Sequence, residues 1–244
     1  MPEPTSLSEN RPSMLARLMA GIAEHAPNVT AGPIDDTLNP DEPGHPEYHR
    51  RQRAEFALTR WTAAVPYRYQ DATATHPAIT AWADRAADDP RAAGFLVLTG
   101  TIGTGKTHQA YGALRRIAET GPRRFEMLAT TAPDLYGRLR PGGSDKGTEH
   151  ELKRLCQIPL LLLDDLGTEK LSEWTEEATY RLINDRYNQC LPLIVTTNFP
   201  VRDPDGAPDL VTRLGDRLAS RLAQAATVVH LDGPDLRRTF RSAG

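Results

Sequence analysis

Cysteine is scarce in this sequence, and long apolar runs are missing. Only Cys156 and Cys190 occur in 244 residues, the seven histidines are scattered, and there is no HExxH motif or Cys/His cluster. Two thiols cannot form a disulfide framework or complete a usual four-ligand zinc site, so we interpret both as reduced packing residues. No secretory signal is recognisable, and the longest apolar run, residues 160–163, is too short to cross a membrane. We therefore expect a cytoplasmic protein without a membrane partner.

A large excess of charge of either sign is also missing. The formal net charge is −3, and 25% charged with 39% hydrophobic residues is typical of a soluble globular protein. A nearly neutral chain has no global positive field, so any contact with nucleic acid must come from a local basic patch. Candidates are Arg50, Arg51, Arg53, Arg123 and Arg124, although such a scatter is also typical of a solvated face.

Residues 1–65 are predicted to form a separate N-terminal region of linkers and helices, partly disordered and possibly a site for a partner. Pro40 and Pro43 favour an extended linker around residues 39–44. Before it, residues 13–25 place apolar side chains at helical spacing, and this helix either binds a partner or packs on the main domain. Further helices are predicted at residues 49–64 and 76–87.

From residue 94 onward, short apolar strands alternate with helices. This alternation predicts an α/β fold over residues 66–244, in which helices cover both faces of a parallel sheet in three layers. The predicted strands are residues 95–99, 124–129, 160–163, 193–196 and 227–231. The predicted helices are residues 106–120, 134–139, 149–156, 174–190 and 210–224.

Residues 100–107, GTIGTGKT, fit the P-loop pattern G-x-x-x-x-G-K-[ST], with a predicted strand before it and a predicted helix after it. The glycines let successive N–H groups turn toward phosphates, and the following helix adds its positive dipole end. We expect Lys106 to neutralise phosphate charge and Thr107 to ligate Mg²⁺. The predicted cofactors are ATP and Mg²⁺, and the nucleotide-binding candidates are Gly100, Thr101, Ile102, Gly103, Thr104, Gly105, Lys106, Thr107 and the adjacent His108.

Polar side chains follow two of the predicted strands. Asp164 and Asp165 end the apolar run at 160–163, where buried carboxylates are costly without a cation. We assign Asp164 to the Mg²⁺ shell and Asp165 to orienting and deprotonating the attacking water, although Asp also caps helices and turns. Asn198 follows the strand at 193–196, where it either holds the water or the γ-phosphate or serves as a turn residue before Pro200.

Arg217 and Arg221 lie four residues apart and therefore on one face of the predicted helix at 210–224. They either pair with carboxylates on the same surface or supply an arginine finger to the γ-phosphate of a neighbouring subunit. Spacing alone does not decide between these roles.

Taken together, five segments in this order resemble one known family: GTIGTGKT, LLLLDDLGTEK, WTEEATYRLINDRYNQ, LIVTTN and LGDRLASRL. They are similar to bacterial replicative-helicase loaders of the DnaC/DnaI type and to their relatives, the IstB-type transposition helper ATPases, both of the AAA+ class. The resemblance covers roughly residues 66–237. It implies a RecA-like AAA+ core of the P-loop NTPase kind, without a C-terminal helical lid.

The resemblance also implies roles for single residues. Asp164 and Asp165 match the Walker B pair, Asn198 the sensor I position, and Arg221 the arginine finger with Arg217 beside it. Arg237 falls where a sensor II-like arginine acts, and we place it among the ATP-binding candidates. The second Walker B acid is Asp rather than Glu, and its shorter side chain suggests slow basal hydrolysis.

Three functions remain open from the sequence. The first is an ATPase that loads the replicative helicase onto single-stranded DNA and assembles into an ATP-dependent homo-oligomer. The second is an IstB-like transposition helper that binds DNA and a transposase. The third is a regulatory ATP-binding adaptor without productive turnover. The N-terminal region does not match the helicase-binding domain of well-known loaders and lacks the cysteines for the zinc site that some of them have there.

Overall fold

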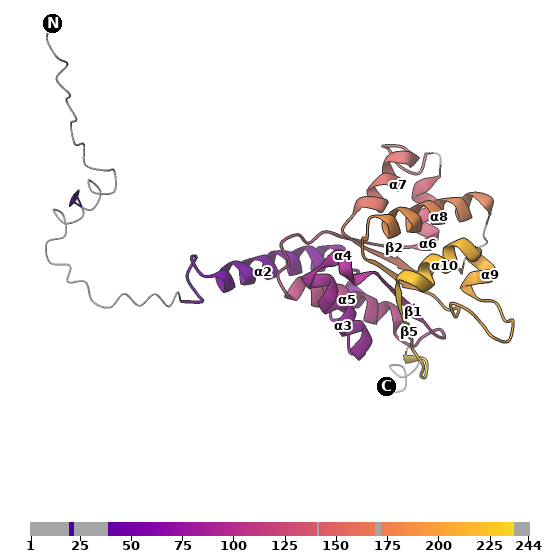
Figure 1. Ribbon diagram of the computed structural model, residues 1–244, viewed down its shortest axis with the longest axis horizontal. Helices are drawn as coiled ribbons and strands as arrows, with labels where there is room; N and C mark the ends of the chain where they lie inside the picture. Colours follow the sequence, from indigo (N-terminus) through magenta and orange to yellow (C-terminus); the bar gives the residue numbers. More distant parts are fainter. Residues whose placement is uncertain (1–19, 22–38, 141, 169–171, 237–244) are drawn as a thin grey trace, which may run out of the picture.

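The computed structural model describes residues 20–21, 39–140, 142–168 and 172–236 (Figure 1). Five parallel strands form one sheet in the order β2-β3-β4-β1-β5. The predicted helix at 13–25 lies outside the described residues apart from 20–21. The strands are β1 (Phe95–Thr99), β2 (Met127–Thr131), β3 (Leu160–Asp164), β4 (Leu193–Thr196) and β5 (Ala226–His230).

Helices cover the sheet on both faces, and this confirms the predicted three-layer α/β fold (Figure 1). The side chains of β1 alternate between the layers: Leu96 and Leu98 pack with α2, α3 and α5, whereas Phe95 and Val97 pack with α6 to α10. One layer contains α2 (Pro46–Ala64), α3 (Pro77–Asp88), the short α4 (Pro90–Ala93) and α5 (Lys106–Glu119). The other contains α6 (Ala132–Leu139), α7 (Thr148–Gln157), α8 (Glu173–Asn188), α9 (Leu210–Leu214) and α10 (Asp216–Ala225).

Two helices begin with proline after a histidine cap. His45 Nδ1 accepts a hydrogen bond from Glu47 N at 3.0 Å, and His76 Nδ1 accepts one from Ala78 N at 3.2 Å. Proline suits the first helical position because its missing N–H would have no partner there. The predicted start of α2 at residue 49 was therefore three residues late, because the preceding proline starts the helix instead of breaking it.

Two further differences from the prediction go beyond shifts of one or two residues at the ends of elements. The single helix expected at 210–224 is two helices, α9 and α10, because Gly215 between them has a φ of 80°, which an α-helix does not allow. The strand expected at 124–129 begins only at Met127. It lies at the edge of the sheet, where β3 is its one pairing partner among the described residues, and this pairing sets its limits.

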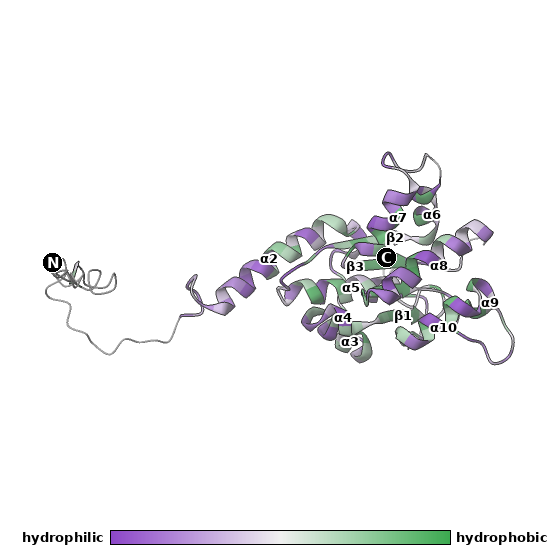
Figure 2. Cartoon of the chain, turned by 45° about the horizontal axis from the view of Figure 1, so that its top comes forward, coloured by the Kyte–Doolittle hydropathy of each residue, from purple (hydrophilic) through white to green (hydrophobic). Residues whose placement is uncertain are grey.

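The second half of α2 packs against α5. Ala57, Trp61 and Val65 are buried in the same core cluster as α5, and Trp61 Nε1 donates to the Tyr111 carbonyl at 3.3 Å. Figure 2 shows the first half of α2 extending away from the sheet. The domain boundary at residues 65 and 66 stays a prediction. None of the helices in the described part of the chain is long and apolar enough to cross a membrane.

Candidate functional site

Residues 100–105 form a loop between the end of β1 and the start of α5. Gly105 caps α5 with a φ of 88°, a left-handed conformation that other residues rarely adopt. Gly103 also has a positive φ of 89°, and a Cβ at this position would overlap the carboxylate of Asp235. Because a glycine cap offers no side chain to the first N–H groups of α5, this helix end suits an anion.

The side chain of Lys106 is buried in this loop, although it carries a charge. Its Nζ donates to the carbonyls of Gly100 at 2.9 Å and Thr101 at 2.8 Å. Ile102, by contrast, is 63% exposed at the tip of the loop, and His108 is half-buried in the first turn of α5. The fold therefore holds the ammonium group of Lys106 against the backbone that is predicted to bind phosphate.

The carboxylate of Asp164 lies between two hydroxyl groups. Thr107 Oγ1 donates to Asp164 Oδ1 at 3.0 Å, and Thr196 Oγ1 donates to the same oxygen at 2.5 Å. Burial raises the pKa of Asp164, as does the charge of Asp165, whereas the two hydroxyls and Lys106 act in the opposite direction. The structure thus brings together Lys106, Thr107 and Asp164, which the sequence places up to 58 residues apart.

Asp165 has a left-handed backbone with a φ of 57°, the conformation that Asp tolerates better than most residues. Its N–H donates to Thr196 Oγ1 at 2.9 Å. The next N–H, of Leu166, donates to the Thr196 carbonyl at 2.9 Å. These bonds turn the chain sharply at the end of β3, and such strained turns are common at functional sites.

Asn198 lies at the same carboxyl edge, two residues beyond β4. In the register of β3 and β4, Leu163 pairs with Val195, so both strands end together. Thr197 before it is fully buried, its N–H donates to the Leu98 carbonyl at 3.0 Å, and its hydroxyl accepts from Phe199 N at 3.1 Å. Asn198 itself is half-buried, so its amide sits at the edge of the site.

Arg217 and Arg221 lie on α10, in the other helical layer from the loop and α5. Arg217 is exposed, whereas Arg221 is half-buried, and its Nη1 donates to the Arg217 carbonyl at 3.1 Å. The Arg221 guanidinium stacks over the ring of Tyr180 in α8 at 5.0 Å. Both arginines belong to α10, on the face of the sheet opposite α5, and within the described residues the contacts of Arg221 are with Arg217 and Tyr180 and not with the loop at 100–107. Arg237 lies outside the described residues.

The sequence analysis did not identify two residues that make contacts at the carboxyl edge of the sheet, Thr196 and Arg213. Thr196 contacts both Asp164 and Asp165. The sequence feature that could have identified it is a hydroxyl residue at the end of an apolar strand. Arg213 in α9 donates to the Gly167 carbonyl at 2.6 Å and stacks over the Phe199 ring at 4.1 Å. Arg213 thereby joins the loop after β3 to the loop after β4, and no local sequence pattern predicts this contact.

The donor set at this edge fits a nucleotide with a divalent cation. In the described part of the chain, no three His, Cys, Asp or Glu residues gather to form a metal site. Mg²⁺ usually binds one or two carboxylates and takes its other oxygens from phosphates and water. Asp164 and Thr107 would supply the protein oxygens for such an ion, and Lys106 with the N-terminus of α5 would supply positive charge for phosphates.

Fold and site together define a P-loop protein of the AAA+ class. A family model described as "IstB-like ATP binding protein" matches residues 69–243. The chain belongs to this family of ATP-binding proteins, as the resemblance in the sequence predicted.

Its relatives include both helicase loaders and insertion-sequence proteins. The chain is 27% identical over 152 residues to the replicative helicase loader DnaI of Bacillus subtilis, covering 58% of this chain and 47% of that protein. It is 28% identical over 145 residues to an ATP-binding protein in an insertion sequence of Mycobacterium tuberculosis, covering 58% of this chain and 55% of that protein. The chain thus spans about half the length of these relatives.

Solved structures show the same fold. The crystal structure of the DnaC helicase loader matches with a TM-score of 0.57 and 27% identity, covering 68% of this chain and 100% of that chain. The structure of DnaI matches with a TM-score of 0.52 and 21% identity, covering 75% and 93%, and supports the fold alone.

Proposed function

We propose that this protein binds and hydrolyses ATP with Mg²⁺ and uses this cycle to load the replicative helicase onto single-stranded DNA. The observation that supports the ATP-dependent part is the partly buried carboxylate of Asp164, held by Thr107 and Thr196 beside Lys106. A buried carboxylate whose pKa is raised by burial is stabilised by a cation. The similarity to DnaC and DnaI supports the loader role.

Each residue of the site has a role in this proposal. Lys106 and the N–H groups of the loop bind the phosphates, while Thr107 and Asp164 hold Mg²⁺, which neutralises phosphate charge. Asp165 orients the attacking water and accepts its proton, and Asn198 holds that water. His108 and Arg237 remain proposed contacts of the nucleotide. Hydrolysis by the shorter Asp165 carboxylate is expected to be slow.

Arg221, with Arg217 beside it, is proposed to act on the nucleotide of a neighbouring subunit. Its place on the face of the sheet opposite α5 supports action between chains over action within one chain. This predicts self-association that depends on ATP. Arg221→Ala should lower both hydrolysis and assembly, measured by phosphate release and sedimentation. Unchanged values of both would refute the assignment.

A second candidate is a transposition helper, which the IstB-like family match and the insertion-sequence relatives favour. Affinity for DNA separates the two candidates. A helper should prefer duplex DNA and bind a transposase, whereas a loader should prefer single strands. A regulatory adaptor would show no turnover, so hydrolysis that Lys106→Ala abolishes would exclude it.

The decisive experiment captures partners from the native cell lysate with the tagged chain and ATP·Mg²⁺. Recovery of the replicative helicase, lost with ADP or in Lys106→Ala, is the result expected. Removing a charged group that binds phosphate should weaken ATP affinity by about 10- to 150-fold. Lys153→Ala, an exposed lysine of α7, is the matched control and should capture normally. Recovery of a transposase instead of the helicase would support the helper.

A further inference from the structure

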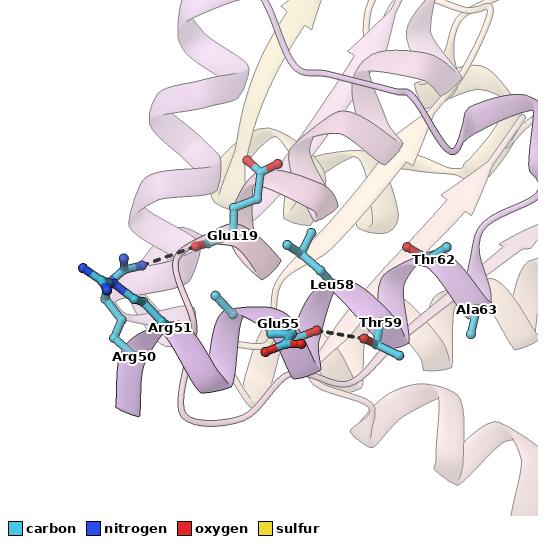
Figure 3. A pocket seen from close by; sticks show the side chains of 9 residues that line it. Arg50, Arg51, Glu55, Leu58, Thr59, Thr62, Ala63 and Glu119 are labelled. Atoms are coloured by element: carbon cyan, nitrogen blue, oxygen red, sulfur yellow. Dashed lines mark hydrogen bonds between the residues drawn. The ribbon is translucent and has the colours of Figure 1, made fainter. Parts of the chain in front are cut away.

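Helix α2 has two faces with different charge balance. On one face, Arg50 pairs with Glu47 at 2.6 Å and Arg51 pairs with Asp41 at 2.5 Å. These two arginines hold the pKa of Glu47 at about 2. The hollow along this face, about 700 Å³, also has Glu55 and Glu119 in its lining (Figure 3). The positive charge here is therefore already neutralised by carboxylates of the chain.

The other face bears a stripe of cationic and aromatic side chains without carboxylates. His49, Arg53, Phe56 and Arg60 follow one another at intervals of four, three and four residues, which places them on one side of the helix. Phe56 is 61% exposed, and the Arg60 guanidinium lies 5.7 Å from the centre of its ring. The stripe spans 12 residues, and the rise from the first to the last is about 16 Å along the helix axis.

This stripe forms one wall of a groove, and the segment after α5 forms the other. The groove has a volume of about 670 Å³ and is lined by Pro46, His49, Gln52, Arg53, Phe56 and Arg123. Arg53 Nε donates to the Gly121 carbonyl at 2.9 Å, which holds α2 beside the segment that bears Arg123. Within the described part of the chain, no ion pair involves Arg53, Arg60 or Arg123, whereas neighbouring Arg124 pairs with Glu126 at 3.2 Å.

We propose that this groove, which we call the α2 groove, binds single-stranded DNA. Guanidinium groups without carboxylate partners attract phosphates, and an exposed aromatic ring stacks on an unpaired base. In a duplex the faces of the bases are covered, so Phe56 would contribute little. An acidic peptide would use the arginines but not the ring. The inference rests on the proposed function for the identity of the strand as DNA, although it requires no hydrolysis.

The helix that bears the α2 groove packs against the helix that begins at the phosphate-binding loop. Trp61 lies one residue beyond Arg60 on α2, and its Nε1 donates to the Tyr111 carbonyl in α5. The first residues of α5 are Lys106 and Thr107. A strand bound on α2 thus lies on a helix packed directly against the helix that begins at the phosphate-binding loop.

The test measures binding of fluorescein-labelled dT20 to the full chain by anisotropy at several salt concentrations. Phe56→Ala should weaken binding by about 5- to 150-fold, the range for one lost base-stacking contact. Arg123→Ala should lower the slope of log affinity against log salt by about 0.7, the value for one phosphate contact on a single strand. Both side chains are exposed, so neither change should unfold the domain.

Two matched controls separate the α2 groove from general surface effects. Tyr67→Ala removes an aromatic ring that is 89% exposed but does not line the groove, and Arg124→Ala removes the neighbouring arginine that is paired with Glu126. Both should bind dT20 like the wild type. A wild-type chain that does not bind dT20, or Phe56→Ala and Arg123→Ala variants that bind normally, would overturn the inference. So would equal or tighter binding to a duplex that is insensitive to Phe56→Ala.

The outcome is distinguishable from that of the proposed function. Capture of the helicase without any effect of the α2 groove variants on DNA would leave the loader function intact and refute the α2 groove. Binding of dT20 that depends on Phe56 and Arg123, without capture of a helicase, would support the α2 groove and refute the loader.

Discussion

A charged side chain is withdrawn from water at each of two edges of the sheet: Asp164, partly buried, at the carboxyl edge, and Arg186, fully buried, at the amino edge. Arg186 is fully buried, and its Nη1 donates to the carbonyls of Leu155 at 2.9 Å and Ile158 at 2.8 Å. Its Nη2 donates to Pro159 O at 3.2 Å and to Pro192 O. These carbonyls lie at the end of α7 and just before β3 and β4, so Arg186 joins three elements from within.

The difference lies in what surrounds each charge. Burial lowers the pKa of Arg186 to about 9, yet four backbone carbonyls accept from it, and at neutral pH it stays charged. Partial burial and the charge of Asp165 raise the pKa of Asp164, and the two hydroxyls and Lys106 offset this only in part. A buried charge bound by backbone groups stabilises the fold, whereas one that burial leaves poorly stabilised is a candidate for binding a cation.

The largest effect is expected for hydrolysis after Asp165→Asn. Asn tolerates the left-handed backbone of this position, so folding should be unaffected, but an amide cannot accept the proton of water. Turnover should fall by about 10²- to 10⁴-fold with little change in ATP affinity, measured by phosphate release and titration with a fluorescent ATP analogue. Asp145→Asn, at an exposed position, serves as the control. Normal turnover in Asp165→Asn would remove this residue from the mechanism.

The amino edge is tested by Arg186→Met. Four backbone carbonyls lose their donor, and the free energy of unfolding should fall by about 3–5 kcal/mol, measured by urea denaturation. Arg181→Met on the same helix breaks only an exposed ion pair with Glu149 at 2.9 Å and should leave the urea midpoint nearly unchanged. Conditions that keep Arg186→Met folded should preserve ATP affinity. If folded Arg186→Met lost ATP affinity, Arg186 would not have a purely structural role, and the contrast with Asp164 would be wrong.

A smaller effect is expected for Thr196→Val. The change keeps the volume but leaves the N–H of Asp165 without its acceptor and Asp164 without one donor. The free energy of unfolding should fall by about 1–3 kcal/mol, with weaker ATP·Mg²⁺ binding in titration. Thr196→Ser keeps the hydroxyl and should restore binding. If valine and serine behave alike, the hydroxyl is not what organises the carboxyl edge.

The smallest effect is expected for the pH dependence of stability that Asp164 contributes in the absence of nucleotide. Because burial raises the folded-state pKa of Asp164 above the unfolded-state value, the folded protein retains a proton that the unfolded chain has lost. This contribution makes stability fall as pH rises from the ordinary carboxyl range through the raised pKa. Asp164→Asn removes it, so the variant should be more stable than wild type above that range, measured by thermal unfolding between about pH 4 and pH 8.

Addition of ATP·Mg²⁺ should reverse that order, because a bound ligand stabilises only the protein that binds it. Wild-type stability should rise with the ligand, and Asp164→Asn should change little. A difference between the two proteins that does not vary with pH would show that the Asp164 carboxylate is not the cause.

Local patterns in the sequence determined most of this fold and predicted the members of its candidate nucleotide site. Continuous apolar runs predicted the strands because parallel strands are buried on both faces. The P-loop pattern predicted roles for Lys106 and Thr107 because phosphate binding needs glycine turns before a helix. They missed the break at Gly215 and the early start of α2, where one glycine or proline outweighs a helical pattern over many residues.

Only the tertiary structure decided how distant residues meet. It brought Thr196 to Asp164 across neighbouring strands, wrapped backbone carbonyls around Arg186, and gave α2 one neutralised and one cationic face. Short-range patterns report which side of an element faces the core. They cannot report which partner a buried polar group finds, because that partner comes from another element, and satisfying buried polar groups is a property of the assembled fold.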